Sequence, residues 1–215
     1  MALILPFTAA GSGEGLSTVR RVLAAHGIIA VPTETHYGLA VSPMDDEALS
    51  RLFAVKGRPS GKPILLLIGN RSQLTPLVAS IPSAAALLME CCWPGPLTLV
   101  FPAAASLPPM LTGGTGTIGI RLPPVPDLCA LLEFIGPLTG TSANRSAEPP
   151  LDRAEDVQRL LGDAIDLILD GGHTPGGLSS TVVDVCGQPR LLRAGVLPTE
   201  EIRAALARQG IELSS

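Results

Sequence analysis

The chain has 215 residues, of which 46% are hydrophobic, 16% charged and 3% aromatic, with 23 glycines and 21 prolines. At about 150 residues per domain this length predicts one domain, and the apolar fraction excludes a disordered or collagen-like chain. Fifteen Lys and Arg against 19 Asp and Glu give a net charge of −4. The charge therefore excludes a nucleic-acid-binding protein that is basic overall, and any cationic site must be local.

Hydrophobic periodicity and turn residues predict helices and strands that alternate along the chain. The first half is expected to hold a helix over 14–26, strands over 28–31 and 38–42, a helix from a cap at Asp45 or Asp46 to about Val55, a strand over 64–68, a helix over 83–92 and a strand over 97–101. The second half is expected to hold a strand over 117–122, a helix over 127–134, a strand over 137–141, a helix over 153–161, strands over 165–169, 181–185 and 190–193, and a helix over about 199–208 capped by Thr199.

The order of these elements predicts a single α/β domain over 1–215, with its motif-bearing core at about 14–195. Several strands follow each other directly, so we expect a mixed parallel and antiparallel sheet with surrounding helices. The run 64–68 is apolar on both faces, which predicts a central strand.

The apolar stretches and cysteines indicate a cytoplasmic protein without membrane contact. The longest aliphatic run, 64–68, is far too short to span a bilayer, and the N-terminus lacks the basic region of a signal peptide. The four cysteines are Cys91, Cys92, Cys129 and Cys186. They form no CxxC pair and have no metal-ligand spacing, so we expect reduced thiols that fill core space and no metal site.

The two lysines of the chain lie in one segment, KGRPSGK (56–62). Lys56, Arg58 and Lys62 place three cations among two glycines and a proline, which predicts an exposed loop that can wrap an anion. Lysine supplies a compact charge for phosphate, and arginine supplies a bidentate fork. The alternative is a solvated loop after a helix, where cations favour the C-terminal dipole.

Two polar clusters, PTETHYG (32–38) and TGTSAN (139–144), directly follow predicted buried strands. Ligands of α/β sheets bind at such strand ends, whereas the alternative is that these residues form turns or cap a helix. His36 has two interpretations: a catalytic residue, or a surface or hydrogen-bonded histidine. The GTGTIG segment (114–119) spells a dinucleotide fingerprint, but a strand rather than a helix follows it, so we reject that motif.

Seven segments in order resemble the YrdC-like family of L-threonylcarbamoyladenylate synthases. They are PTETHYGL (32–39), KGRPSGKP (56–63), WPGPLTLV (93–100), TIGIRLP (117–123), TSAN (141–144), SSTVVDV (179–185) and RAG (193–195). The resemblance implies a twisted mixed sheet with helices around a concave, positively charged cavity. It also implies a nucleotidyltransferase that joins L-threonine, bicarbonate and ATP, with Mg²⁺, into threonylcarbamoyl-AMP and releases pyrophosphate.

The resemblance also implies partners and site residues. The product would feed threonylcarbamoyladenosine modification of tRNA through a downstream transfer machinery, with weak RNA binding as a further property. The implied threonine contacts are Thr33, Arg121 (for the carboxylate) and Ser180. The implied ATP contacts are Lys56, Arg58, Thr117, Ser142, Asn144 and Arg193, of which Lys56 and Arg58 would also be catalytic. The plainer alternative is that Arg121 and Arg193 are strand-end charges and Ser180 a turn residue.

The chain departs from the family pattern at three places. His36 stands where an aliphatic residue is usual, and Arg-Ser-Ala-Glu-Pro (145–149) replaces the common Ser-Gly after Asn144. Twenty residues follow Gly195, so we expect a single-domain form. The alternatives are a relative that hydrolyses threonylcarbamoyl-AMP or transfers a carbamoyl group, and an RNA-binding module, which the acidic charge and the scarcity of aromatic residues disfavour.

Overall fold

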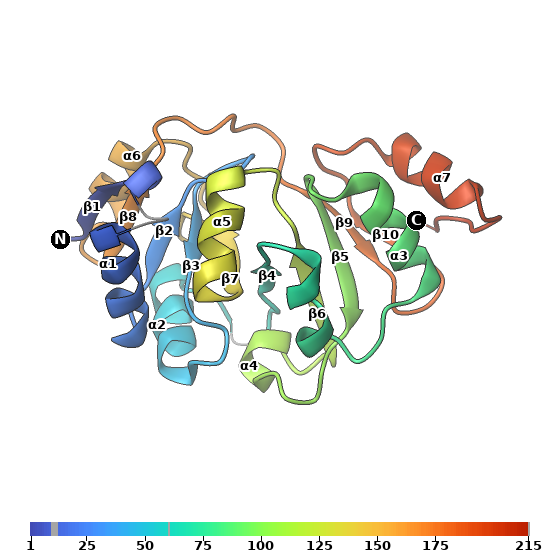
Figure 1. The fold of residues 1–215 in the computed structure, drawn as a ribbon, viewed down its shortest axis with the longest axis horizontal. Helices are drawn as coiled ribbons and strands as arrows, with labels where there is room; N and C mark the ends of the chain where they lie inside the picture. The colour runs from blue at the N-terminus through green and yellow to red at the C-terminus, as the bar shows by residue number, and fades with distance from the viewer. Residues whose placement is uncertain (10–12, 60, 215) are drawn as a thin grey trace.

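The described residues (1–9, 13–59 and 61–214) form a ten-stranded sheet in the computed structural model (Figure 1). The strands are β1 (Leu3–Pro6), β2 (Ile29–Val31), β3 (Gly38–Ala40), β4 (Leu65–Leu67), β5 (Leu97–Pro102), β6 (Thr117–Arg121), β7 (Leu138–Ser142), β8 (Leu167–Asp170), β9 (Thr181–Asp184) and β10 (Arg190–Arg193). Their order is β1-β8-β2-β3-β7-β4-β6-β5-β9-β10. Strand β8 pairs in parallel with β1 and β2, β4 with β6, and β5 with β9, whereas β7 runs antiparallel to both β3 and β4. The predicted mixed sheet, with β4 near its centre, is confirmed.

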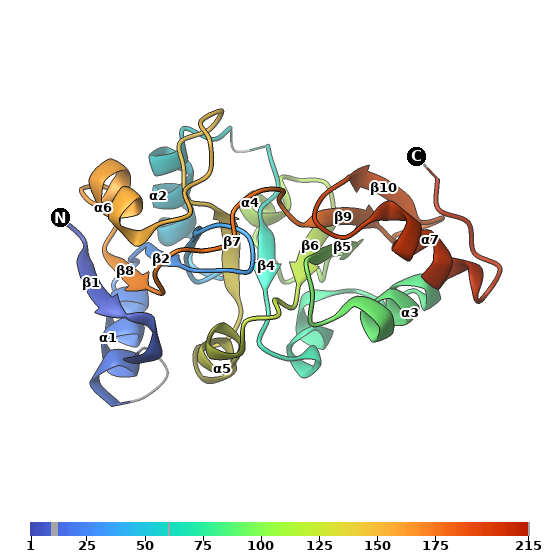
Figure 2. The same ribbon diagram turned by 90° about the horizontal axis from the view of Figure 1, so that it is seen from above.

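Helices cover both faces of the sheet. They are α1 (Gly13–Ala24), α2 (Asp46–Lys56), α3 (Ser83–Cys92), α4 (Pro109–Thr112), α5 (Pro126–Ile135), α6 (Ala154–Leu161) and α7 (Thr199–Ala207), with 3₁₀ turns η1 (Phe7–Ala9), η2 (Arg71–Gln73) and η3 (Thr75–Leu77). In Figure 2, α1 and α5 lie on one side of the strands, and α2 and α6 lie on the other. Asp45 caps α2 as predicted, because its Oδ1 accepts from the Ala48 N–H at 3.0 Å.

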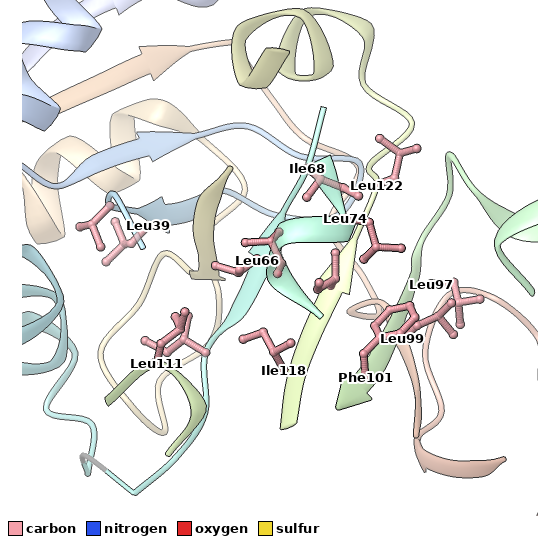
Figure 3. Close-up of a cluster of buried hydrophobic side chains, with 14 of the residues drawn as sticks. Leu39, Leu66, Ile68, Leu74, Leu97, Leu99, Phe101, Leu111, Ile118 and Leu122 are labelled. Atoms are coloured by element: carbon pink, nitrogen blue, oxygen red, sulfur yellow. The ribbon is translucent and has the colours of Figure 1, made fainter. Parts of the chain in front are cut away.

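The hydrophobic core occupies one face of β5 and β6. Leu97, Leu99 and Phe101 of β5 point into the cluster that Figure 3 shows, and Ile118 of β6 points into the same cluster. Successive side chains of a strand point to opposite faces. The intervening residues, such as Thr98 and Arg121, are therefore directed to the other face, where the functional site lies.

Several bounds differ from the predicted ones by a few residues, and helix α4 was not predicted. Two further differences concern strand β1 and the start of α7. Strand β1 was not expected, because a four-residue, largely exposed segment ending in Pro6 shows no alternation; it pairs in parallel with β8 at the edge of the sheet. Thr199 was expected to cap α7 but is its first residue. Pro198 occupies the cap position in an extended conformation (φ −58°, ψ 137°) and offers no side-chain hydrogen bond.

The cysteines are free thiols, and the prediction that they fill core space holds in part for Cys92 and Cys129, which pack against the core, and is wrong for Cys91 and Cys186. Cys91 and Cys186 are exposed, and Cys92 and Cys129 are half-buried. In α3 the buried stripe includes Leu88 and Met89, and helical spacing continues it to Cys92 rather than Cys91. Cys186 follows the last residues of β9, in the turn to β10.

Candidate functional site

A cavity of about 520 Å³ lies on the face of the sheet opposite the β5–β6 core. Alternate residues of neighbouring strands line it, including Thr98 and Val100 from β5 and Thr117, Gly119 and Arg121 from β6. The segment before β3, the end of β7 and the strands β9 and β10 complete the wall. A volume of this size is typical of sites for nucleotides and other small molecules.

Two glycines leave space at the bottom of the cavity that a side chain would fill. A Cβ atom at Gly140 would lie 2.8 Å from Leu65 Cδ1 and Leu67 Cγ, closer than real side-chain contacts. A Cβ atom at Gly119 would lie 3.3 Å from Thr98 Cγ2. Because both positions line the cavity, glycine lets the flanking side chains pack together and leaves the floor open.

Three of the four arginines that line this cavity come from different elements: Arg58 after α2, Arg121 from β6 and Arg193 from β10. Burial lowers the pKa of each of them, and the charge of Arg121 lowers the pKa of Arg193 further. Since arginine remains charged at physiological pH, Arg121 and Arg193 repel each other across the wall. An anion bound between them would relieve that repulsion.

Arg121 forms a buried ion pair with Glu34, whose side chain does not line the cavity. Nη1 of Arg121 lies 3.0 Å from Oε1 of Glu34, and the side chains are 8% and 12% exposed. A further pair lies at the β9–β10 end, where Arg190 Nη2 is 3.7 Å from Asp184 Oδ2. Asp184 therefore places one acid in the cavity wall, and Glu34 places a second beside Arg121 but outside the lining.

A hydroxyl network joins Ser180 to the arginine wall. The Ser180 hydroxyl is 2.9 Å from the Thr98 hydroxyl and accepts from Arg193 Nη2 at 3.1 Å. Arg193 also donates to the Ser180 carbonyl, from Nη2 at 2.8 Å and from Nε at 3.1 Å. Strand β10 thus fixes Arg193 against the segment that enters β9, and Ser180 is buried between the two.

The segment between β2 and β3 is a tight turn held by its own side chains. The Thr33 hydroxyl donates to the His36 carbonyl at 2.7 Å and accepts from the Thr35 N–H at 3.2 Å. His36 is buried, and its Nε2 lies 3.0 Å from the Gly177 carbonyl oxygen, so this histidine links the turn to the segment that precedes β9. Thr33, Thr35 and His36 all line the cavity.

Lys56 is buried, which corrects the prediction that it begins an exposed loop. It is the last residue of α2, and its Nζ donates to the Ser142 carbonyl at 2.5 Å and to the carbonyl and Oδ1 of Asn144, both at 3.0 Å. The exposed positions of that segment begin at Gly57. Burial, and then the charge of Arg58, lowers the pKa of Lys56 to about 8.

The polar turn after β7 is equally well bonded. The Ser142 hydroxyl donates to Asn144 Oδ1 at 2.6 Å, and Asn144 Nδ2 donates to the Glu148 carbonyl at 2.5 Å. A recess of about 180 Å³, lined by Lys56, Lys62 and Asn144 among others, shares Arg58 and Ser142 with the wall of the main cavity. The recess therefore adjoins the cavity at these two side chains.

The structure brings all the predicted site residues to these two hollows. The main cavity is lined by Thr33, Arg58, Thr117, Arg121, Ser142, Ser180 and Arg193, and the recess is lined by Lys56, Arg58, Ser142 and Asn144. This placement agrees with a shared site but leaves the individual roles as predictions. Among the described residues, no group of three His, Cys, Asp or Glu could hold a metal ion, and no helix is long and apolar enough to cross a membrane.

The profile of the Sua5/YciO/YrdC family, described as "Telomere recombination", matches residues 21–195. The chain belongs to this family. It is 40% identical over 181 residues to the threonylcarbamoyl-AMP synthase of Pyrococcus abyssi (83% of this chain, 53% of that protein). It is 37% identical over 169 residues to the protein of the same name from Thiobacillus denitrificans (78% and 89%). The crystal structure of P. abyssi Sua5 complexed with L-threonine matches 99% of this chain and 62% of that one, with a TM-score of 0.88 and 33% identity.

These matches confirm the predicted YrdC-like resemblance and fold. The chain spans about half the length of the P. abyssi protein and most of the T. denitrificans protein. Sequence reasoning missed Glu34 and Thr98, the partners of Arg121 and Ser180. Both lie inside quoted family segments, but nothing in a single sequence shows which side chains meet across the cavity.

Proposed function

We propose that this chain joins L-threonine, bicarbonate and ATP into L-threonylcarbamoyladenylate and releases pyrophosphate. The observation that carries the proposal is the meeting of Arg58, Arg121 and Arg193 in one cavity of nucleotide size. ATP, bicarbonate and the threonine carboxylate are all anions, and their assembly requires clustered cations. The two relatives named threonylcarbamoyl-AMP synthase support the same reaction.

The proposed chemistry needs positioned anions rather than a nucleophilic side chain. The threonine amine attacks the carbon of bicarbonate, and water leaves as the carbamate forms. A carbamate oxygen then attacks the α-phosphorus of ATP, and pyrophosphate leaves with the electron pair of the broken P–O bond. Such transfers depend on orientation and on stabilisation of negative charge, which fixed arginines supply.

Threonine is proposed to bind at the inner wall of the cavity. Arg121 would hold its carboxylate, and the hydroxyls of Thr33 and Ser180 would recognise its side-chain hydroxyl. The P. abyssi structure with L-threonine supports an amino acid as the ligand of this fold. Both proposed hydroxyl partners are buried. A hydroxyl has one donor and two acceptor sites, and the Ser180 hydroxyl, bonded to Thr98 and Arg193, keeps one of them for the ligand.

ATP is proposed to contact Lys56, Arg58, Thr117, Ser142, Asn144 and Arg193. Arg58 belongs to both hollows, which suits a phosphate chain that runs from one to the other. Lys56 would reach a phosphate only by giving up one of its three present hydrogen bonds. We propose that Mg²⁺ enters on the phosphates of ATP, because it retains several waters and is commonly bound through substrate phosphates.

The remaining parts of the proposal concern the cell. A cytoplasmic location, delivery of the product to a downstream tRNA-modifying machinery, and weak RNA binding follow from the proposed activity. The cavity volume suits a nucleotide better than a polynucleotide backbone, and no observation favours hydrolysis or carbamoyl transfer over synthesis.

The proposal is tested by incubating the protein with ATP, bicarbonate, Mg²⁺ and threonine and measuring threonylcarbamoyl-AMP by mass spectrometry. Valine in place of threonine is the matched control, because it differs by one hydroxyl. We expect kcat/KM for valine to be lower by about a hundredfold or more, since a site built to pair a hydroxyl rejects the analogue without it. Absence of product from folded protein would refute the synthase activity, and equal turnover of both amino acids would refute the hydroxyl contacts.

A further inference from the structure

The turn between β2 and β3 fixes the direction of each hydrogen bond in its hydroxyl pair, Thr33 and Thr35. Thr33 Oγ1 lies 2.7 Å from the His36 carbonyl oxygen, which can only accept, so the single hydroxyl proton of Thr33 lies between these two oxygens. Thr33 Oγ1 also accepts from the Thr35 N–H at 3.2 Å. Its contact with Thr35 Oγ1 at 3.1 Å is therefore donated by Thr35, because Thr33 has no second proton.

The two hydroxyls differ in what they can still offer a ligand. A hydroxyl has one donor and two acceptor sites. Thr33 uses all three, since it donates to His36 and accepts from both the N–H and the O–H of Thr35. Thr35 Oγ1 gives its proton to Thr33 and accepts from none of the other described residues. Thr35 is 5% exposed and lines the cavity, so a buried side chain of the wall retains two free acceptor sites and no free donor.

The same arrangement occurs a second time in the cavity wall, at Thr115 and Thr117. The Thr115 hydroxyl donates to the Thr112 carbonyl at 2.7 Å and accepts from the Thr117 N–H at 3.3 Å. Its contact with the Thr117 hydroxyl at 2.9 Å is therefore donated by Thr117. Both residues line the cavity, and the second of them is the residue proposed to contact ATP. In each segment the first threonine orients the second, and the second keeps its acceptor sites.

We propose that Thr35, and not Thr33, is the hydroxyl of this turn that contacts the substrate, and that its oxygen accepts a hydrogen bond from an N–H or O–H group of the amino acid. The inference rests on the proposed function and refines it, because Thr33 becomes the positioning residue that holds the Thr35 proton away from the ligand. An oxygen with only acceptor sites repels carboxylate and phosphate oxygens and attracts a donor. L-Threonine carries two such donors, its amino group and its hydroxyl.

The absence of a free proton on Thr35 suits a contact with the amino group. In the proposed reaction the amine attacks the carbon of bicarbonate with its lone pair. A hydroxyl that could donate would bond to this lone pair and oppose the attack. Thr35 has no proton to donate and can hold the amine only through an N–H, which leaves the lone pair free. We therefore expect the amino group on Thr35 and the ligand hydroxyl on Ser180.

The test measures dissociation constants by calorimetry for L-threonine, for L-valine, which lacks the hydroxyl, and for 3-hydroxybutanoate, which lacks the amino group. Thr35→Val replaces the hydroxyl by a methyl group, and Thr35→Ser keeps it. We expect Thr35→Val to bind L-threonine about tenfold to a hundredfold more weakly than the natural protein, and Thr35→Ser to stay within about threefold. Unchanged affinity for L-threonine in folded Thr35→Val overturns the inference.

The other two ligands identify the donor. A loss in Thr35→Val that valine shares and 3-hydroxybutanoate does not share assigns the contact to the amino group. A loss that 3-hydroxybutanoate shares and valine does not share assigns it to the ligand hydroxyl. An equal loss for all three ligands would show a disturbed turn and not a missing hydrogen bond, and it also overturns the inference.

A matched control and two further measurements complete the test. Thr112 is 6% exposed, donates to the Pro109 carbonyl at 3.2 Å and lies outside the cavity lining, so Thr112→Val should leave the affinity for threonine unchanged. If Thr35→Val does not fold, equal binding of all three ligands by the natural protein overturns the inference. A natural protein that makes no threonylcarbamoyl-AMP refutes the proposed function. One that makes it while Thr35→Val binds threonine normally refutes this inference alone.

Discussion

The recess and the main cavity differ in how completely their buried charges are hydrogen-bonded. In the Lys56 cluster (Lys56, Ser142 and Asn144) three protein oxygens accept from the ammonium, and the Ser142 hydroxyl bonds to the Asn144 side chain. In the Arg121 pair (Arg121 and Glu34) two carboxylate oxygens and one guanidinium nitrogen have no hydrogen-bond partner among the described residues. The Lys56 ammonium is therefore fully hydrogen-bonded within the protein, whereas the Arg121 pair is not.

This difference distinguishes a charge that stabilises the fold from a charge that is available to bind a ligand. An ammonium has three donors, and those of Lys56 are matched by three acceptors that join the end of α2 to the turn after β7. A ligand gains little there unless it displaces a protein acceptor. Arg121 retains unmatched capacity beside a cavity, so an incoming anion adds bonds without breaking any.

Breaking the Arg121 pair should have the largest effect on stability. Arg121→Leu leaves Glu34 as an unpaired buried charge, and we expect the free energy of unfolding to fall by about 3–5 kcal/mol. The double variant with Glu34→Leu removes both charges and should recover most of that loss, although neither variant should bind threonine. Urea unfolding curves measure both effects. A double variant as unstable as Arg121→Leu would show that the loss comes from packing and not from the unpaired carboxylate.

Lys56 offers a second way to test the comparison, with Lys62 as its matched control. Lys56→Ala removes the donor to three buried acceptors and should lower the free energy of unfolding by about 1–3 kcal/mol. If Lys56 also contacts ATP, kcat/KM for ATP should fall about tenfold to a hundredfold. Lys62→Ala, at an exposed position of the same segment, should leave stability unchanged. Lost stability with unchanged ATP kinetics would show that Lys56 stabilises the fold and does not contact ATP.

The elements of the fold were largely predictable, whereas the bonding within the site was not. Helix α3 begins and ends at the predicted residues because its apolar spacing is a local pattern, although Pro82 at its N-cap offers no side-chain hydrogen bond. The partner of Arg121 lies 87 positions earlier in the chain, and the acceptors of Lys56 include backbone carbonyls, which carry no sequence signal. The family segments placed the right residues at the strand ends. Tertiary packing decides which of these side chains are fully hydrogen-bonded within the protein and which keep groups free for a ligand.

The smallest predicted effect concerns pH and the charge of Lys56. Burial lowers its pKa from 10.5 to about 8 in the folded chain, so between these two values the unfolded chain binds more protons than the folded one. Stability must then rise with pH, by up to about 1.4 kcal/mol per pH unit for one proton. Between pH 8 and 9.5 we expect the natural protein to gain about 1–2 kcal/mol relative to Lys56→Met, which lacks the titrating group.

Urea unfolding of both proteins at pH 7.5, 8.5 and 9.5 measures this difference, with Lys62→Met as the control that should follow the natural protein. All other titratable groups are common to the three chains, so their contributions cancel in the comparison. A constant difference between the natural protein and Lys56→Met would mean that the three oxygens hold the ammonium charged throughout the range. The Lys56 cluster would then be more completely bonded than its burial implies, and its contrast with the Arg121 pair would be sharper still.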